Sequence, residues 1–255
     1  MASSDTLSIF VPNSGETITQ TTTSGARVLT SLSADTVNTR VFPNKGRSIE
    51  DVGIKESTTG DTRTTFSGAS KDISYAGNAD DNTVTFTGNT RNTSISTGAG
   101  DDTLIATDIT RGTISLGSGD NTAITGALKN TTMTSGAGAD SYTITGKADS
   151  VRISTGSGDD TLIFGGKVSD STIMLGQGAD ILDFSAKVKD TWINLGENDA
   201  AVDQVFFNTR GDLGNGTQIF GAGDGDLLII GGEEYTFDTS QTAFISTQGD
   251  SITFG

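Results

Sequence analysis

An aspartate or asparagine recurs at one position in five glycine-rich segments of the sequence. The segments share the pattern G-x-G-x-[D/N]-x-U, where U is a residue that we expect to point inward. They are GAGDDTL (98–104), GSGDNTA (117–123), GAGADSY (136–142), GSGDDTL (156–162) and GQGADIL (176–182). A carboxylate or amide oxygen at a fixed place in a glycine turn can accept backbone N–H bonds, as in an Asx-turn. One role that the pattern predicts is therefore the closing of a backbone turn.

The same segments resemble the RTX, or hemolysin-type, calcium-binding repeat, G-G-x-G-x-D-x-U-x. Members of that family form parallel β-rolls, in which calcium lies between stacked turns and is held by the aspartate carboxylate and by turn carbonyls. An all-oxygen shell suits this ion. The chain departs from the family pattern at the first glycine, which is replaced in all five copies, and it carries one motif per turn instead of two. The resemblance implies Ca²⁺ as the cofactor, with the ligands Asp102, Asn121, Asp140, Asp160 and Asp180.

The motif belongs to a longer repeat. A leading apolar residue returns after 19, 19, 20, 20 and 20 residues, and a fixed period of this size is typical of a stacked solenoid. The leading residues are Ile95, Ile114, Met133, Ile153, Ile173 and Ile193. Glycine recurs every few residues and no helical apolar stripe persists, so the pattern favours strands over helices. The fold class that we predict is all-β, a parallel β-solenoid of about ten turns of about 20 residues, with an irregular N-terminal segment.

We expect three regions along the chain. Residues 1–53 follow no clear period and are predicted to form a cap or attachment segment. Residues 54–218 are predicted to form the solenoid, and residues 219–255 its lengthened last turns and a C-terminal cap. At about 4.8 Å per stacked strand, the turns would form a rod roughly 45–50 Å long.

Two columns of apolar residues lie two positions apart in each turn, which places both on one face of a strand. Leu104, Leu162 and Leu182 belong to the first of these inward columns. The residues that follow the first column should point outward, and they are Ile105, Ile124, Thr143, Ile163 and Asp183. Because a contiguous apolar stripe usually marks a contact surface, we expect lateral association, into a homo-oligomer or onto a capsid surface. Coverage of the stripe by the N-terminal segment is the alternative.

Lysines form a second ladder, at positions Lys129, Lys147, Lys167 and Lys187, and Asp149, Asp170 and Asp190 follow the last three at two or three residues. One interpretation is a binding stripe for an anionic glycan or an acidic partner. The other is a solvated edge with alternating charge, which surface strands carry against aggregation.

Composition excludes several classes of function. The 32 acids against 16 bases give a net charge of −16, which argues against binding to nucleic acid or to an anionic membrane. No run approaches the ~20 apolar residues of a membrane span, and the N-terminus lacks the features of a secretory signal peptide. Histidine is absent and no nucleophile or phosphate-loop motif occurs, so we expect no enzyme.

The sequence therefore predicts a non-enzymatic structural surface protein. By analogy with display proteins, we expect a bacteriophage virion component on the virion surface, such as a capsid decoration or a knob-like appendage. The alternative is an extracellular RTX-type calcium-binding protein exported by type I secretion. A glycan-binding adhesin or lyase is a third hypothesis.

Overall fold

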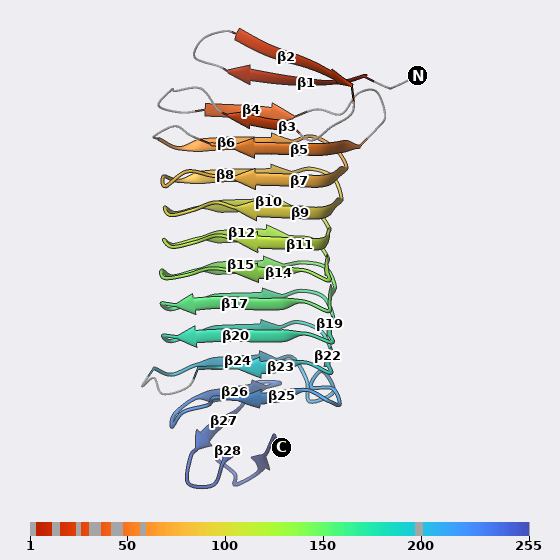
Figure 1. Cartoon of the computed structure of the whole chain (residues 1–255). Helices are drawn as coiled ribbons and strands as arrows, with labels where there is room; N and C mark the ends of the chain where they lie inside the picture. Colours follow the sequence, from red (N-terminus) through yellow and green to blue (C-terminus); the bar gives the residue numbers. More distant parts are fainter. Residues whose placement is uncertain are drawn as a thin grey trace.

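The chain folds into a rod of stacked β-strands (Figure 1). The computed structural model describes residues 48–56, 60–196 and 201–254 in full, and the backbone of four strands before residue 48. Every regular element in these ranges is a strand, and none of the described residues belongs to a helix able to span a membrane. The prediction of an all-β parallel solenoid is confirmed, with about nine turns.

The first long sheet receives one strand from each turn. Its parallel strands join in register, so that equivalent residues of successive turns lie side by side. In rod order they are β4 (Val37–Val41), β6 (Thr62–Phe66), β8 (Asn82–Phe86), β10 (Thr103–Ala106), β12 (Thr122–Thr125), β15 (Ser141–Ile144), β18 (Thr161–Phe164), β21 (Ile181–Phe184), β24 (Gln204–Phe207) and β26 (Leu227–Ile230).

The second long sheet faces the first across the core. Its main strands are β3 (Arg27–Thr30), β5 (Ile49–Lys55), β7 (Ser70–Ala76), β9 (Thr90–Ser96), β11 (Ile109–Ser115), β14 (Thr132–Thr134), β17 (Arg152–Ser157), β20 (Thr172–Gln177), β23 (Trp192–Asn194) and β25 (Gln218–Phe220). In the turns after β11, a short strand precedes each of the main strands β14, β17, β20 and β23. The short strands are β13 (Leu128–Lys129), β16 (Ala148–Asp149), β19 (Val168–Ser169) and β22 (Val188–Lys189).

The core consists of like residues stacked one turn apart. Leu104 is completely buried, whereas 41% of the surface of the next residue, Ile105, is exposed. The rings of Phe164 and Phe184 are stacked with centroids 5.2 Å apart, and Phe207 continues the stack at 5.0 Å from Phe184. These contacts confirm the predicted inward columns. Each turn can bury its apolar side chains because its neighbours supply the matching ones.

Each of these turns has a sharp corner in the second sheet, which lies within the strand in β5, β7, β9 and β11 and between the short and the main strand in the later turns. The corner residue has a positive φ, a conformation that non-glycine residues rarely adopt, and in the eight described turns it is Asp51, Asp72, Asn92, Arg111, Asn130, Ser150, Asp170 or Asp190. A buried hydroxyl supports the corner in several turns. The hydroxyl of Thr131 donates to the carbonyl of Lys129 at 3.0 Å and accepts the N–H of Gly112, one turn earlier, at 3.3 Å.

Parallel strand pairing extends at both ends beyond residues 54–218, the range predicted for the solenoid. β3 pairs with β5 and β4 with β6, and β26 is the last parallel strand. After it, Gly231 and Gly232 both have positive φ, at 61° and 85°, which suits a two-residue hairpin turn. The chain therefore reverses into an antiparallel meander of β27 (Glu233–Asp238), β28 (Ala243–Ser246) and β29 (Ser251–Ile252). At the other end, the hairpin of β1 (Ser4–Val11) and β2 (Glu16–Thr23) lies next to β4 (Figure 1).

Candidate metal centre in the stacked loops

Each glycine-rich segment forms the loop that leads from the second sheet into the first. Gly117 and Gly156 adopt φ values of 85° and 114°, which glycine tolerates without a steric cost. Successive loops also touch: a Cβ atom on Gly117 would lie 1.5 Å from the carbonyl oxygen of Gly98, and one on Gly156 would lie 1.9 Å from that of Gly136. The glycines are thus required both by the local turn and by the close stacking of the loops.

The aspartate or asparagine of each loop is buried and binds the preceding turn. Oδ1 of Asp140 accepts the N–H of Asn121 at 2.9 Å, and Oδ1 of Asp160 accepts the N–H of Asp140 at 2.8 Å. The same contact repeats along the rod through the inner ladder, which consists of Asn82, Asp102, Asn121, Asp140, Asp160, Asp180, Asp203 and Asp226. All five residues expected from the sequence therefore lie in one column, inside the rod.

Three members of the inner ladder were not expected from the sequence: Asn82, Asp203 and Asp226. Their loops lack the regular glycine spacing on which the motif was recognised. The remaining signal is the [D/N]-x-U part of the motif, an aspartate or asparagine two residues before a buried apolar residue such as Val84 or Val205.

The asparagines show what the second side-chain atom of a ladder residue can do. Nδ2 of Asn121 donates to the carbonyl oxygen of Gly119 at 2.8 Å. At the aspartate positions an oxygen replaces this donor, and an ionised carboxylate can only accept. The Oδ2 atoms of Asp102, Asp140 and Asp160 are buried without a hydrogen-bond partner. Aspartate is therefore the less well satisfied residue at this place in the loop.

Burial changes the acidity of the inner ladder. Desolvation raises the pKa of Asp102, Asp140 and Asp160 above its usual range, because a buried carboxylate is less stable in its charged form. For Asp160 the pKa is raised to about 6. Burial is the largest cause, and the neighbouring carboxylates of Asp140 and Asp159 add to it, against hydrogen bonds that lower it. These three aspartates thus keep their protons to a higher pH than ordinary aspartates do.

The contacts do not provide the shell that calcium takes in proteins, which has about six to eight oxygens. Oδ1 of each ladder aspartate already accepts an N–H. Loop carbonyls are also engaged: that of Gly117 accepts the N–H of Gly136, and that of Gly136 accepts the N–H of Ser157. The described residues contain no group of three or more acidic side chains placed to hold a metal ion. The geometry fits the hydrogen-bonded turn, and calcium binding stays a prediction.

A second acidic ladder lies on the outside of the loops. Its side chains bind the following turn, whereas those of the inner ladder bind the preceding one. Oδ1 of the exposed Asp101 accepts the N–H of Asp120, one turn later, at 2.8 Å. Asp120 does the same for Ala139 at 2.8 Å, and Asp159 for Ala179 at 2.9 Å. The paired acids of the motif thus have distinct structural roles, since one carboxylate binds the loop before it and the other the loop after it.

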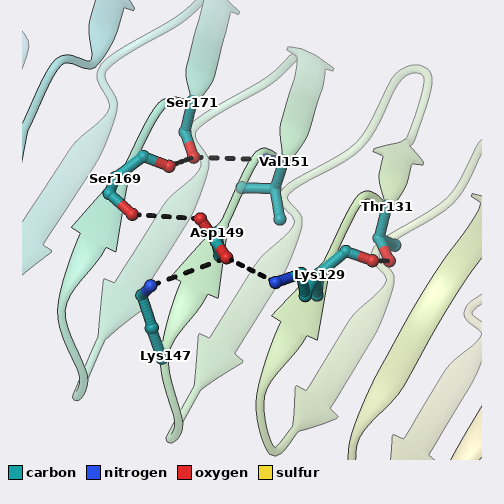
Figure 2. Close-up of polar contacts among 7 residues, drawn as sticks. All are labelled: Lys129, Thr131, Lys147, Asp149, Val151, Ser169 and Ser171. Carbon is teal, nitrogen blue, oxygen red and sulfur yellow. Dashed lines mark hydrogen bonds and ion pairs between the residues drawn. The ribbon is translucent and has the colours of Figure 1, made fainter.

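The lysine ladder is only partly paired. Nζ of Lys129 lies 3.1 Å and Nζ of Lys147 lies 3.5 Å from Oδ2 of Asp149, while the hydroxyl of Ser169 donates to its Oδ1 at 3.2 Å (Figure 2). The hydrogen bond from Lys129 is the largest cause that lowers the pKa of Asp149. Both lysines are more than half exposed. Exposed pairs of this kind contribute about 0–1 kcal/mol, so these contacts favour the solvated edge over a built binding site.

The expected outward stripe lies on the open face of the first sheet. Ile105 and Ile124 are adjacent in the sheet and are 41% and 44% exposed. Thr143, Ile163 and Asp183 continue the row in register and are half-buried. The hairpin β1–β2 lies at the end of the rod, beyond β4 (Figure 1). Association through this face stays a prediction.

No protein-family model, no curated protein and no solved structure matches the chain. Its function must therefore be inferred from its own residues.

Proposed function

We propose that the chain is a non-enzymatic structural protein, displayed on the surface of a bacteriophage virion as a capsid decoration or knob-like appendage. The observation that supports this role is the unbroken parallel stack from β3 to β26. The same columns are buried in the turns whose side chains the structure describes, and the loops between β9 and β21 are short. Such a rod is stiff and exposes long, regular faces, which are the properties that a display element needs.

The two ends of the rod also suit display. An exposed sheet edge can pair with another chain and polymerise. Here the meander β27–β29 continues the first sheet with short antiparallel strands, and the hairpin β1–β2 lies against the other end. Both arrangements limit growth along the rod axis, so that contacts with other chains would form through the sides.

An RTX-type calcium-binding protein exported by type I secretion is the second candidate. The five glycine-rich motifs support it. The inner ladder weighs against it, because the carboxylate oxygens that hold calcium in that family bind backbone N–H groups in this chain.

Mass spectrometry of purified virions and of the cell-free supernatant would distinguish the two candidates. A virion component should co-purify with particles through a density gradient, at a constant ratio to the major capsid protein. Enrichment in the supernatant, with none in the particle fraction, would contradict the proposal and favour secretion.

A further inference from the structure

Two aromatic side chains project from the outer face of the second sheet. Trp192 of β23 is 56% exposed and Phe220 of β25 is 37% exposed. Their ring centroids are 5.6 Å apart and the rings are nearly perpendicular, at 82°. Alternation along the strands explains why they point outward, since Ile193 and Ile219 fill the core column between them. It does not explain why large aromatic residues occupy these positions, because the two rings contact each other outside the core.

The surroundings of the two rings are polar. In the sheet, Trp192 lies between Thr172 and Gln218, and Phe220 lies beside Asn194. The half-buried Met174 precedes Asn194 in the same row, and its sulfur lies 3.4 Å from a guanidinium nitrogen of Arg152. We call Arg152, Met174, Trp192, Asn194, Gln218 and Phe220 the aromatic patch.

We propose that the aromatic patch is a binding site for a neutral carbohydrate. A sugar ring has an apolar face of C–H groups and a rim of hydroxyls. The face can pack on an exposed aromatic ring, and the rim can reach amide and guanidinium groups, which both donate and, for the amides, accept hydrogen bonds. The patch offers these two kinds of contact within one or two strand spacings. This inference goes beyond the structural role proposed above and does not depend on it.

Charge and size favour a neutral sugar over other ligands. Arg152 is the one charged residue of the patch, and the whole chain carries −16, so an anionic polymer would be repelled. A stable protein interface buries about 800 Å² on each partner and has an apolar centre. Here a hydroxyl and an amide side chain border the two rings at one strand spacing, since Thr172 lies beside Trp192 and Asn194 beside Phe220. The apolar area is thus suited to a few sugar rings.

The sheet next to the patch could accommodate a longer glycan. On the outer face of β11, β14 and β17, hydroxyl side chains stand in register, one strand apart at about 4.8 Å. They are Thr113, Ser115, Thr132, Thr134 and Ser154. Because this row leads toward the rings, a chain of several sugars should bind more tightly than a disaccharide.

The chain provides its own reporter for a test, because Trp192 is its single tryptophan. The full-length protein would be titrated with neutral gluco-, manno-, galacto- and chito-oligosaccharides of two to six sugars. Tryptophan emission and its quenching by acrylamide would be recorded. We expect at least one series to shift the emission to shorter wavelength and to protect Trp192, saturably and with higher affinity for the longer members.

Variants with an intact reporter locate the site. Phe220→Ala should weaken binding about tenfold or more, the usual cost of losing an aromatic anchor, and Asn194→Ala should weaken it less. Ile181→Ala removes an exposed apolar side chain from the other sheet and should leave the affinity unchanged. Circular dichroism would show that each variant folds.

Three results would overturn the proposal. One is the absence of any change with the whole panel, together with no binding to an array of neutral glycans. Another is an equal loss of affinity in Phe220→Ala and Ile181→Ala. The third is an emission shift that depends on protein concentration without sugar and disappears in Phe220→Ala, which would identify the patch as a contact between copies of the chain.

Discussion

At the scale of single residues, the inner ladder joins successive loops by mutual hydrogen bonding. A glycine loop leaves backbone N–H groups that need partners when they are buried. In this rod the N–H of a ladder residue, for example that of Asp140, is satisfied by the ladder side chain of the next turn, here Asp160. The arrangement has an electrostatic cost, because charges about 4.8 Å apart repel by roughly 1–3.5 kcal/mol at effective dielectric constants of 80 to 20. Asn121 relieves it by separating Asp102 from Asp140.

The stability of the rod should depend on pH through Asp160. Its folded pKa is about 6, and that of an unfolded aspartate is about 3.9. Between these values the folded state binds more protons at this residue, so the contribution of Asp160 to the free energy of unfolding is largest below about pH 4, falls as the pH rises toward 6, and stays lower above it. Two pKa units correspond to roughly 2–3 kcal/mol. Asp102 and Asp140 should act in the same direction. Urea unfolding at pH 4.5 and pH 7.5 would measure the difference.

Two opposite substitutions test the cause of this pH dependence. Asp160→Asn keeps the Oδ1 acceptor and supplies an amide that can donate as Asn121 does to Gly119, so it should flatten the profile and stabilise the protein at pH 7.5. Asn121→Asp should steepen the profile and destabilise it there. If Asp160→Asn leaves the difference between the two pH values unchanged, the titrating group lies elsewhere.

Calcium gives the second test of the ladder residues. A calcium ladder predicts a higher thermal midpoint in millimolar Ca²⁺ than in EGTA, since a ligand that binds only the folded state stabilises it. It also predicts that Mg²⁺ has no such effect, and that Asp140→Ala with Asp160→Ala abolishes the difference. From the engaged Oδ1 atoms and loop carbonyls we expect equal midpoints. A thermal midpoint that rises with Ca²⁺ but not with Mg²⁺ would contradict the interpretation that hydrogen bonds alone hold the loops.

At the scale of the strand, stability depends on the columns. Phe164 stacks on the ring of Phe184 in the next turn, is in register with Ile144 of the preceding turn, and is completely buried. Phe164→Ala should reduce the free energy of unfolding by about 3–5 kcal/mol, because the cavity cannot close without shifting the strands on either side. Ile163→Ala, the adjacent outward residue on β18, should cost much less. Urea unfolding of both variants would show the difference, and equal losses would mean that the inside and outside of the strand are reversed.

The sequence was sufficient to predict the period, the sheets and the inward columns. The reason is that two patterns indicate which residues of each strand point inward. One is the alternation within the strand, and the other is the match with the equivalent residues of the preceding turn, 19–20 residues earlier. It could not predict which way the loop side chains bond. Whether the oxygen of Asp140 faces an ion or the N–H of Asn121 depends on how closely Gly136 and Gly117 stack, and spacing alone does not reveal that distance.

The ends of the stack were harder to predict for a related reason. The inward places of the early turns hold residues such as Thr62, Thr64 and Asn82, which are buried but polar. A repeat recognised by its apolar residues cannot be detected there, although the parallel strand pairing continues through β3 and β4. The corner residues show the same limit, because nothing in the sequence near Arg111 indicates its φ of 58°.

At the scale of the whole molecule, the two sheets present different outer surfaces. The second sheet is rich in hydroxyls and ends in the aromatic patch. The first sheet carries an apolar row, and Ile181, which is 38% exposed, lies beside Thr161 on the next strand, diagonally across from Ile163. A second copy of the chain would match the spacing of this row, since its strands repeat at the same distance of about 4.8 Å. Two flat faces of this kind can pack as sheets do in a sandwich.

The rod should therefore associate through the open face of the first sheet. The paired variant Ile105→Lys and Ile163→Lys places two charges in that face, and burial of an unpaired charge in an interface is strongly unfavourable. We expect light scattering to give a dimer or larger species for the wild-type protein and a monomer for the variant, with both thermal midpoints similar. The pair Thr113→Lys and Thr132→Lys adds the same charge to the second sheet and should leave the mass unchanged.

A wild-type monomer, with mass and stability untouched by the isoleucine changes, would show that this face does not drive assembly. Association that both lysine pairs disrupt equally would instead point to net charge as the cause, because the chain already carries −16.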